Sequence, residues 1–376
     1  MKRKLSLVLA MVMVIALLAA CGNNPNNQPT QPTPDTSNTT PDANNTEPTD
    51  PVDVDDDIMG DGSVYTLTIH HHDPVTSATG QFLEEWASRV TAASMGRLQF
   101  DILHGGTLGS PRDTYDFVTS GAAHLGWGLV SYFPGVFTNS EAIALPMLPL
   151  YDADMSSYVF WNLYENTDFL TAEYEGLHVL LLHANSQSPI STKSFEIKTV
   201  EDLAGWNIRV NSGPPTEFVK NLGASPLAVT ITELYNAIDN NTVDAVITDW
   251  HAIKSFQLFE PIGYYLEANV GVSGYFFVMN QEIYAALPAE LQKVLDEQSG
   301  AAALEYCGSF WNDVTALVKD DIAADNDIIY TLSDEEQAKL QAIADQTIAD
   351  WTASHADGDA IYEAILGFID EYNANN

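Results

Sequence analysis

The chain has 376 residues, with 14 Lys or Arg against 52 Asp or Glu and a formal net charge of −38 at pH 7. This length is sufficient for two ordinary domains or one large one. The negative charge repels phosphate backbones, so we expect no nucleic-acid partner. Two cysteines are too few for a disulfide framework or a four-cysteine zinc site.

Residues 1–20 are predicted to be a signal peptide. Met1–Lys4 is basic, Leu5–Ala20 is uncharged and apolar, and Leu18–Gly22 (LAACG) resembles the bacterial lipobox, with Cys21 as the residue that receives the lipid. The alternative is an ordinary signal peptide with a chance cysteine. A diacylated Cys21 carries two acyl chains, enough for stable anchoring. We therefore expect the mature protein on the outer face of a membrane.

Residues 21–62 are predicted to be the lipidated cysteine and a disordered acidic tether. The segment is rich in Asn, Pro, Thr and Asp and has almost no large apolar residue, so it cannot bury enough surface to offset the entropy lost on ordering. About 40 residues of flexible chain have an r.m.s. reach of roughly 35 Å. The folded part is predicted to begin at residue 63.

The first half of the folded part alternates strands with helices. Phe82, Trp86 and Val90 recur at i, i+4 and i+8 and mark the apolar face of a helix. The predicted strands cover residues 64–70, 98–103 and 123–127, and the predicted helices cover 77–95 and 110–121.

The same alternation restarts downstream, and from Gln281 onward the chain is mostly helical. The predicted helices cover 155–175, 214–222 and 231–240, with a short one after Thr199. The predicted strands cover 177–183, 207–210, 227–229 and 243–247. Such alternation is typical of βαβ units and parallel sheets. We predict an α/β fold with two lobes, a ligand cleft at the carboxyl ends of the strands and a helical C-terminal part.

Motifs for catalysis or cofactor binding are absent from the sequence. No Walker A, HExxH or GxSxG pattern occurs, and Cys307 falls in a predicted helix as a small core residue. With so many acids, carboxylate pairs meet by chance, so a hydrolase acid pair cannot be argued from sequence. We expect no enzyme activity and no cofactor; a secreted hydrolase is the less favoured alternative.

Four consecutive residues, His70–Asp73, form the sharpest local cluster at the end of the first predicted strand. Neighbouring strand residues point to opposite faces, so only His70 and His72 could share a metal site. A metal-binding lipoprotein that uses these two histidines is one alternative. The other is that each histidine hydrogen-bonds a ligand or a backbone group, and we include both as candidate ligand-binding residues without a metal.

Arg209 lies inside a predicted strand, between Ile208 and Val210. A buried guanidinium needs a fixed partner, and its planar fork matches a carboxylate. From the residues alone, either Arg209 pairs with one of the many acids of the chain or it is available for an anionic ligand.

Aromatic residues at strand ends are further candidates. Trp127 lies between two glycines, Trp250 follows Asp249 after a strand, and Tyr275 follows Gly274. Core packing is the commoner fate of aromatic residues, but their placement in both halves makes them candidates for lining a cleft.

A longer sequence pattern supports the prediction of a two-lobe fold with a ligand cleft. Ile197–Val210 (IKTVEDLAGWNIRV) resembles a segment of the DctP-type extracellular solute-binding proteins of TRAP transporters. Shorter matches follow the order of that family, and together they cover roughly residues 63–330. They are Leu108–Ser110, Gly121–Leu125, Leu145–Met147, Leu222–Pro226, Glu233–Ala237, Val243–Ala245, Met279–Asn280 and Leu287–Pro288.

The resemblance implies a two-lobe fold of the periplasmic-binding-protein type, in which a hinge lets the lobes close on an organic acid. Lobe I would comprise 63–187 plus 275–315, lobe II 188–274 plus 316–376, and a long helix within 290–318 would span both. Arg209 matches the arginine that pairs with the ligand carboxylate. The candidate ligand-binding residues are Arg209, Trp127, Trp250, His72, Asn211, Asp249, Tyr275 and His70.

Departures from the family pattern bear on the solute. The stretch Asn185–Pro189 lacks a second arginine that many members carry, and His124 replaces the usual Asp. One arginine with aromatic neighbours favours a monocarboxylate over a dicarboxylate. The expected partners of this monomer are the small and large permease subunits; a sensory system is the alternative.

Overall fold

The computed structural model describes residues 62–325 and 327–376. The predicted signal peptide, the lipidation site Cys21 and the predicted tether up to residue 61 lie outside the described residues. Among the helices of the described part, none combines the length and the apolar character needed to cross a bilayer.

Five strands form the first sheet, in the order β2-β1-β3-β10-β4. β1 pairs in parallel with β2 and β3, whereas β10 lies antiparallel between β3 and β4. The prediction of parallel pairing is therefore wrong for this half of the sheet, because the chain returns from the second lobe in the opposite direction. The strands are β1 (Tyr65–His70), β2 (Leu98–Leu103), β3 (Leu125–Leu129), β4 (Leu177–Ala184) and β10 (Gly274–Asn280).

Helices surround this sheet. Ser77 caps the first helix by accepting a hydrogen bond from Gly80 N, and Phe82, Trp86 and Val90 are at most 1% exposed, which confirms the predicted apolar face. The helix predicted over 155–175 ends at Glu165 and is followed by the short 3-10 helix Thr171–Tyr174. The helices are α1 (Ala78–Ala93), α2 (Thr114–Thr119), α3 (Ala153–Glu165), α7 (Gln281–Ala286) and α8 (Ala289–Glu297).

Six short strands form the second sheet, in the order β11-β9-β5-β8-β6-β7. β6 pairs in parallel with β7 and β8, while β5 is antiparallel to β8 and β9, so this sheet is also mixed. The strands are β5 (Ile190–Thr192), β6 (Asn207–Arg209), β7 (Ser225–Leu227), β8 (Ala245–Ile247), β9 (Tyr264–Leu266) and β11 (Ile328–Tyr330). The helices between them are α4 (Pro214–Asn221), α5 (Ile231–Asp239) and α6 (Trp250–Ser255).

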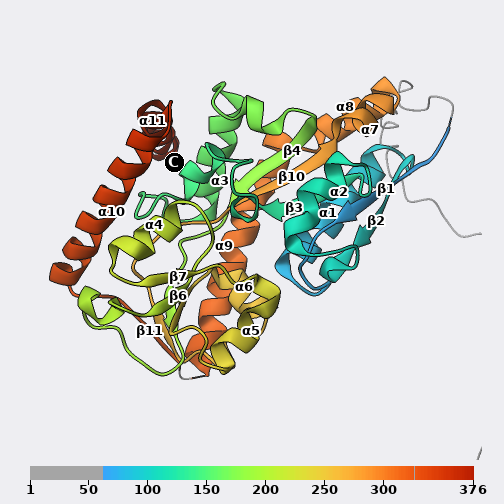
Figure 1. The fold of residues 1–376 in the computed structure, drawn as a ribbon. Coiled ribbons are helices and arrows are strands. Elements are labelled where there is room, and N and C mark those ends of the chain that lie inside the picture. Colours follow the sequence, from blue (N-terminus) through green and yellow to red (C-terminus); the bar gives the residue numbers. More distant parts are fainter. Residues whose placement is uncertain (1–61, 326) are drawn as a thin grey trace, which may run out of the picture. The chain divides into compact units, whose positions relative to one another are not determined.

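The C-terminal part is helical and joins the two lobes. Helix α9 (Gly300–Ala324) contacts α3 and β4 of the first lobe and α6 and β11 of the second (Figure 1). We expected the long spanning helix within 290–318, and it extends further, to Ala324. Helix α10 (Asp334–Ser354) packs on α4. Helix α11 (Gly358–Asn375) instead packs on α3 in the first hydrophobic core, although we expected all of 316–376 to accompany the second lobe.

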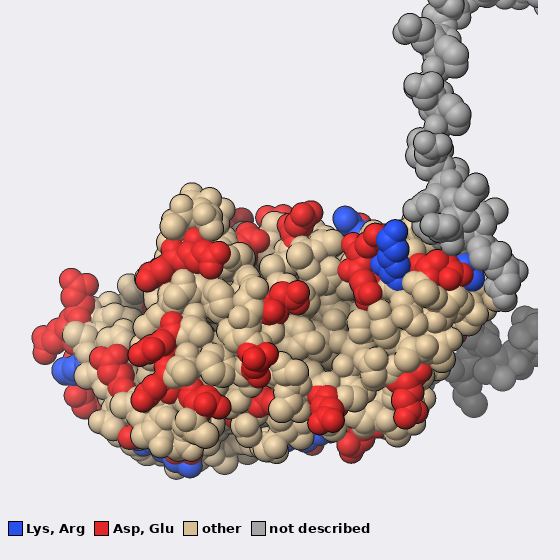
Figure 2. All heavy atoms as spheres, turned by 90° about the horizontal axis from the view of Figure 1, so that it is seen from above, with Lys and Arg blue, Asp and Glu red and all other residues tan. Residues whose placement is uncertain are grey.

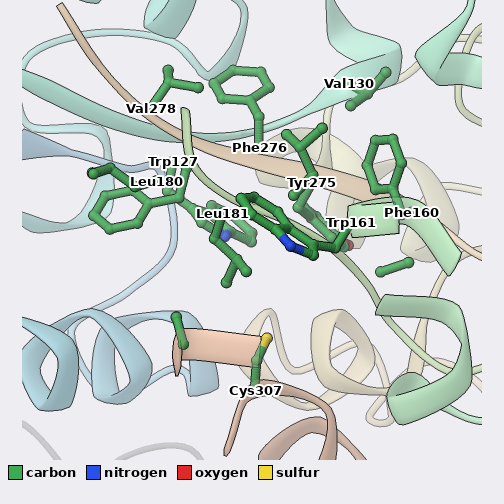
Figure 3. Close-up of a cluster of buried hydrophobic side chains, with 14 of the residues drawn as sticks. Trp127, Val130, Phe160, Trp161, Leu180, Leu181, Tyr275, Phe276, Val278 and Cys307 are labelled. Atoms are coloured by element: carbon green, nitrogen blue, oxygen red, sulfur yellow. The ribbon is translucent and has the colours of Figure 1, made fainter. Parts of the chain in front are cut away.

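The first core lies around β10 and β3. Figure 3 shows part of it, including Trp127, Tyr275 and Phe276 together with Cys307 of helix α9. Cys307 is fully buried, and burial raises the pKa of its thiol, which fits the prediction of a core residue. The wall of the candidate site is therefore continuous with the core of the first lobe.

We expect Gly308→Ala to lower the free energy of unfolding by about 1–3 kcal/mol, as overpacking does. A methyl group at Gly308 would lie 2.4 Å from Cα of Asp154, so α9 and α3 would have to move apart. Gly367 in α11 is the control, because a methyl group there has no neighbour within 4 Å. Gly367→Ala should stabilise by about 0.5–1 kcal/mol. Urea unfolding measures both changes, and an undiminished stability of Gly308→Ala would contradict the close packing of α9 on α3.

Candidate ligand-binding site

A cavity of about 290 Å³ lies between the two lobes, at the ends of their strands. The first lobe contributes residues that follow β1, residues of β3 and the turn after it, and Tyr275 at the start of β10. The second lobe contributes residues at the ends of β6 and β8 and the first turns of α5 and α6. Ligands of open α/β sheets bind at this edge.

Arg209 is the last residue of β6, and its side chain is 1% exposed. Its guanidinium donates through Nε to the carbonyl oxygen of Val229 at 3.0 Å and through Nη1 to that of Ile247 at 3.2 Å. Among the described residues, no carboxylate forms an ion pair with it. Of the two alternatives left by the sequence, the internal acid partner is therefore absent from the described part of the chain. The two carbonyls fix the fork, and its positive charge lies on the cavity wall.

Aromatic rings form the opposite wall. Trp127 and Tyr275 stack with ring centroids 4.7 Å apart and an interplanar angle of 13°. The Trp127 indole donates to His183 Nε2 at 2.9 Å, which fixes its orientation. The His72 ring lies 5.6 Å from Trp127 and 5.8 Å from Tyr132. The wall is thus largely aromatic, and the Trp127–Tyr275 stack is its flat part.

Asp249 and His251 of the second lobe form an ion pair in the cavity, with Asp249 Oδ1 2.5 Å from His251 Nδ1. Burial opposes ionisation of Asp249, but the imidazolium and hydrogen bonds from Ala252 N and the Tyr275 hydroxyl lower its pKa to about 2. Burial also opposes the charge on His251, yet Asp249 and Asp73 together raise its pKa. Asp249 and His251 each contact the first lobe: the Tyr275 hydroxyl donates to Asp249 Oδ2 at 3.0 Å, and His251 Nε2 lies 3.9 Å from Asp73 Oδ2.

Two buried polar atoms on the cavity wall, His72 Nδ1 and Asn211 Oδ1, have no hydrogen-bond partner among the described residues. Burial lowers the pKa of His72 despite the opposing charge of Asp73, so its ring is neutral at pH 7. Nε2 of His72 lies 3.4 Å from Asp73 Oδ1. That carboxylate favours the tautomer protonated on Nε2, which leaves Nδ1 as an acceptor.

Most of the predicted site residues meet at this cavity. Those that line it are Arg209, Trp127, His72, Asn211, Asp249 and Tyr275. Trp250 instead packs in the core of the second lobe, with its ring 5.7 Å from that of Tyr265. His70 is fully buried, edge-on to Phe117 at 5.2 Å, and does not line the cavity.

The two candidate metal-binding histidines thus have different neighbours. β1 ends at His70, so the alternation of a strand no longer relates His70 to His72. Within residues 62–325 and 327–376, no three or more His, Cys, Asp or Glu side chains are grouped to hold a metal ion.

The cavity is also lined by His251, Asp73 and Tyr132. These three residues were not among the predicted site residues. His251 follows Trp250 in the first turn of α6, where Asp249 is the N-cap residue. The sequence does contain a signal for His251, namely an acid that ends a strand and caps a helix with a histidine in its first turn.

Two α/β lobes thus enclose a cavity whose wall carries the buried guanidinium of Arg209. Residues 69–354 match the family model of bacterial extracellular solute-binding protein, family 7 (DctP), and the chain belongs to this family. The resemblance seen in the sequence is thereby confirmed. The family consists of extracytoplasmic solute-binding receptors rather than enzymes.

Two curated relatives show the extent of the sequence similarity. The outer membrane transporter protein TsaT of Comamonas testosteroni is 21% identical over 285 residues, which make up 74% of this chain and 82% of TsaT. The 2,3-diketo-L-gulonate-binding periplasmic protein YiaO of Escherichia coli is 27% identical over 124 residues, 33% of this chain and 38% of YiaO.

Solved structures of TRAP solute-binding proteins share the two-lobe fold. One from a marine metagenome, in complex with 3-hydroxybenzoate, has a TM-score of 0.78 and 24% identity and covers 82% of this chain and 99% of its own. One from Rhodoferax ferrireducens, with copurified benzoate, has a TM-score of 0.79 and 23% identity, with coverages of 83% and 99%. One from Bordetella bronchiseptica, with bound (R)- and (S)-mandelate, has a TM-score of 0.76 and 23% identity, with coverages of 82% and 99%. The predicted fold class is confirmed.

The Asp249–His251 pair predicts how stability depends on pH. The pKa of His251 is raised above 6.5 in the folded chain, so its contribution is complete below about pH 6.5 and is lost as pH rises through the folded value. We expect His251→Gln to be less stable than the wild type by about 1–3 kcal/mol at pH 6, with a deficit that shrinks as pH rises.

Thermal unfolding from pH 5 to 9 measures this dependence. His178→Gln is the control, because His178 pairs with the half-exposed Asp296 at the surface and should change stability by less than about 1 kcal/mol. A constant difference between His251→Gln and the wild type across this range would contradict the charged pair.

Proposed function

We propose that this chain is the extracytoplasmic receptor of a TRAP-type transporter and that it captures a monocarboxylate between its lobes. Arg209 receives the carboxylate, and the aromatic wall holds the body of the solute. The solute selects the closed arrangement of the lobes, which presents it to the small and large permease subunits.

The observation that carries the proposal is the set of contacts that the Arg209 guanidinium makes. Its guanidinium is buried and held by two carbonyl oxygens, without an acidic partner among the described residues. A buried charge without a counter-charge is costly, and a bound carboxylate removes that cost. The wall carries three further charged groups, because the imidazolium of His251 lies between the carboxylates of Asp249 and Asp73. Arg209 is the one guanidinium of the described cavity wall, so one carboxylate of the solute suits it.

The uncharged part of the wall narrows the class of solute. The Trp127–Tyr275 stack offers a flat surface to a ring, and His72 Nδ1 and Asn211 Oδ1 are acceptors without partners. An aromatic carboxylate with a hydroxyl group matches these features. Three structural neighbours in complex with 3-hydroxybenzoate, benzoate and mandelate support this class of solute.

The proposed position of the receptor follows from its N-terminal sequence. A lipid on Cys21 would anchor the monomer to the outer face of the cell membrane, and the tether would leave the folded part free to meet the permease. Such tethering raises the effective concentration of the receptor near its partner.

We expect the wild type to bind an aromatic monocarboxylate such as benzoate, 3-hydroxybenzoate or mandelate with a Kd at or below about 1 μM, or about −8 kcal/mol. Arg209→Gln should cost about 2–5 kcal/mol of this binding energy. Arg112→Gln is the matched control: Arg112 lies over the Tyr132 ring at 5.5 Å but does not line the cavity. Calorimetry on the folded variants, checked by circular dichroism, measures the losses. Wild-type affinity in Arg209→Gln, or equal losses in both variants, would refute the proposal.

Two tryptophan variants test which indole meets the solute. Trp127→Phe shortens the aromatic wall and removes the donor to His183, so we expect at least tenfold weaker binding of the same acid, about 1.4 kcal/mol. Trp250→Phe affects only the core of the second lobe, so we expect a lower melting temperature and an unchanged Kd. Weaker binding in Trp250→Phe alone would place the solute elsewhere.

A further inference from the structure

A second cavity, of about 540 Å³, adjoins the first and shares Asn211 with it. The first lobe lines it with Ser131 and the 3-10 helix Ser140–Ala144, and the second lobe with Asn211 and Phe218. The two segments that connect the lobes complete the wall, through Ser188 and residues 270–274. We call this cavity the Glu141 chamber. Its wall contains no Lys, Arg or His among the described residues.

Three acceptor atoms of the chamber have no hydrogen-bond partner among the described residues. They are Ser131 Oγ, Glu141 Oε1 and Asn211 Oδ1, all buried, and Ser131 as a whole is 7% exposed. The rest of the lining is largely apolar, with Phe218 and several valines. Buried acceptors of this kind are costly unless a donor reaches them. The carboxylate site at Arg209 does not use Ser131 or Glu141.

The charged groups around Glu141 are mostly acidic. Burial and the neighbouring Glu173 carboxylate raise the pKa of Glu141 to about 7. Glu173 itself is fully engaged, since it accepts hydrogen bonds from the backbone of residues 139 and 140 and from two hydroxyl groups. On its outer side, Glu141 also lines a surface groove with Glu217, Asp350 and His355. Figure 2 shows that acids are spread over one face of the molecule, with Lys and Arg at few places.

We propose that the Glu141 chamber binds a protonated primary amine. An ammonium group has three N–H donors and one positive charge, which match three unpartnered acceptors of which one is a carboxylate. The apolar wall suits the alkyl part of such a molecule. A hydroxyl group has one donor and no charge, and would leave the buried carboxylate without a counter-charge.

The amine can come from two sources with the same chemistry. It is either a free alkylammonium ion or the amino end of a carboxylate solute whose other end is held by Arg209. The second source rests on the proposed function and uses Asn211, which lines both cavities.

Calorimetry at pH 8 with butylamine and 1-butanol tests the chamber. We expect butylamine to bind and 1-butanol to bind at least tenfold more weakly. Glu141→Gln should weaken butylamine binding at least tenfold, whereas Glu217→Gln, which removes an exposed acid of the outer groove, should change it by less than threefold. No butylamine binding to the wild type, equal binding of the alcohol, or equal losses in the two variants would overturn the proposal.

A series from 4-aminobutanoate to 6-aminohexanoate, compared with pentanoate, distinguishes the sources. An amino acid that binds at least tenfold more tightly than both butylamine and pentanoate identifies the amino end of the solute, and Arg209→Gln should remove that gain. Equal binding of butylamine and the amino acids identifies a free amine. Butylamine has no carboxylate for Arg209 and pentanoate has no amine for Glu141, so failure of the carboxylate site and failure of the chamber are separate results.

The wild type offers a second test that needs no variant. An ammonium ion favours the ionised form of Glu141, so binding near pH 7 should release a proton, which calorimetry in phosphate and Tris buffers detects. Affinity should rise about tenfold from pH 6 to pH 8 as a carboxyl group with a pKa of about 7 ionises. Binding without proton release and without this pH dependence would overturn the role of Glu141.

Discussion

The constraint on which the rest of this structure depends is a buried guanidinium that forms no ion pair with any described residue. Arg209 is held by the carbonyl oxygens of Val229, which follows the end of β7, and of Ile247, the last residue of β8. Three parallel segments are thus needed to fix one side chain. The carbonyls orient the guanidinium but carry no negative charge, and we propose that a bound carboxylate supplies it.

Side chains of both lobes surround the guanidinium of Arg209. The Tyr275 hydroxyl of the first lobe reaches Asp249 of the second, and the Tyr132 hydroxyl lies 3.4 Å from Ile231 N. These contacts line the same cavity as Arg209, so they form only when the lobes are together. In the proposed function, solute binding and lobe closure therefore involve the same small set of side chains.

Local sequence patterns were sufficient to predict the helices and strands that carry the site. They were insufficient to predict how strands far apart in the chain pair with one another. Periodicity predicted the buried face of α1 and the strand position of Arg209. It did not predict that β10 enters the first sheet antiparallel, because pairing between strands far apart in the chain leaves no mark on either strand's own pattern.

Within the site, the sequence did not show which of Trp250 and His251 faces the cavity. The two residues are adjacent in the first turn of α6, and the helix phase set by the Asp249 cap alone decides that the imidazole faces the cavity and the indole faces the core. Glu141 lies in a short 3-10 helix without an apolar period, so nothing local indicates that its carboxylate reaches a cavity wall.

The position of β10 has a consequence for how the molecule is made. β10 is an interior strand of the first sheet, yet it is synthesised after β5 to β9 of the second. During synthesis, β3 and β4 therefore precede the strand that lies between them, and roughly 90 residues separate the end of β4 from the start of β10. A chain that ends before residue 274 therefore lacks the strand that joins β3 to β4, and the facing edges of these two strands have no partner.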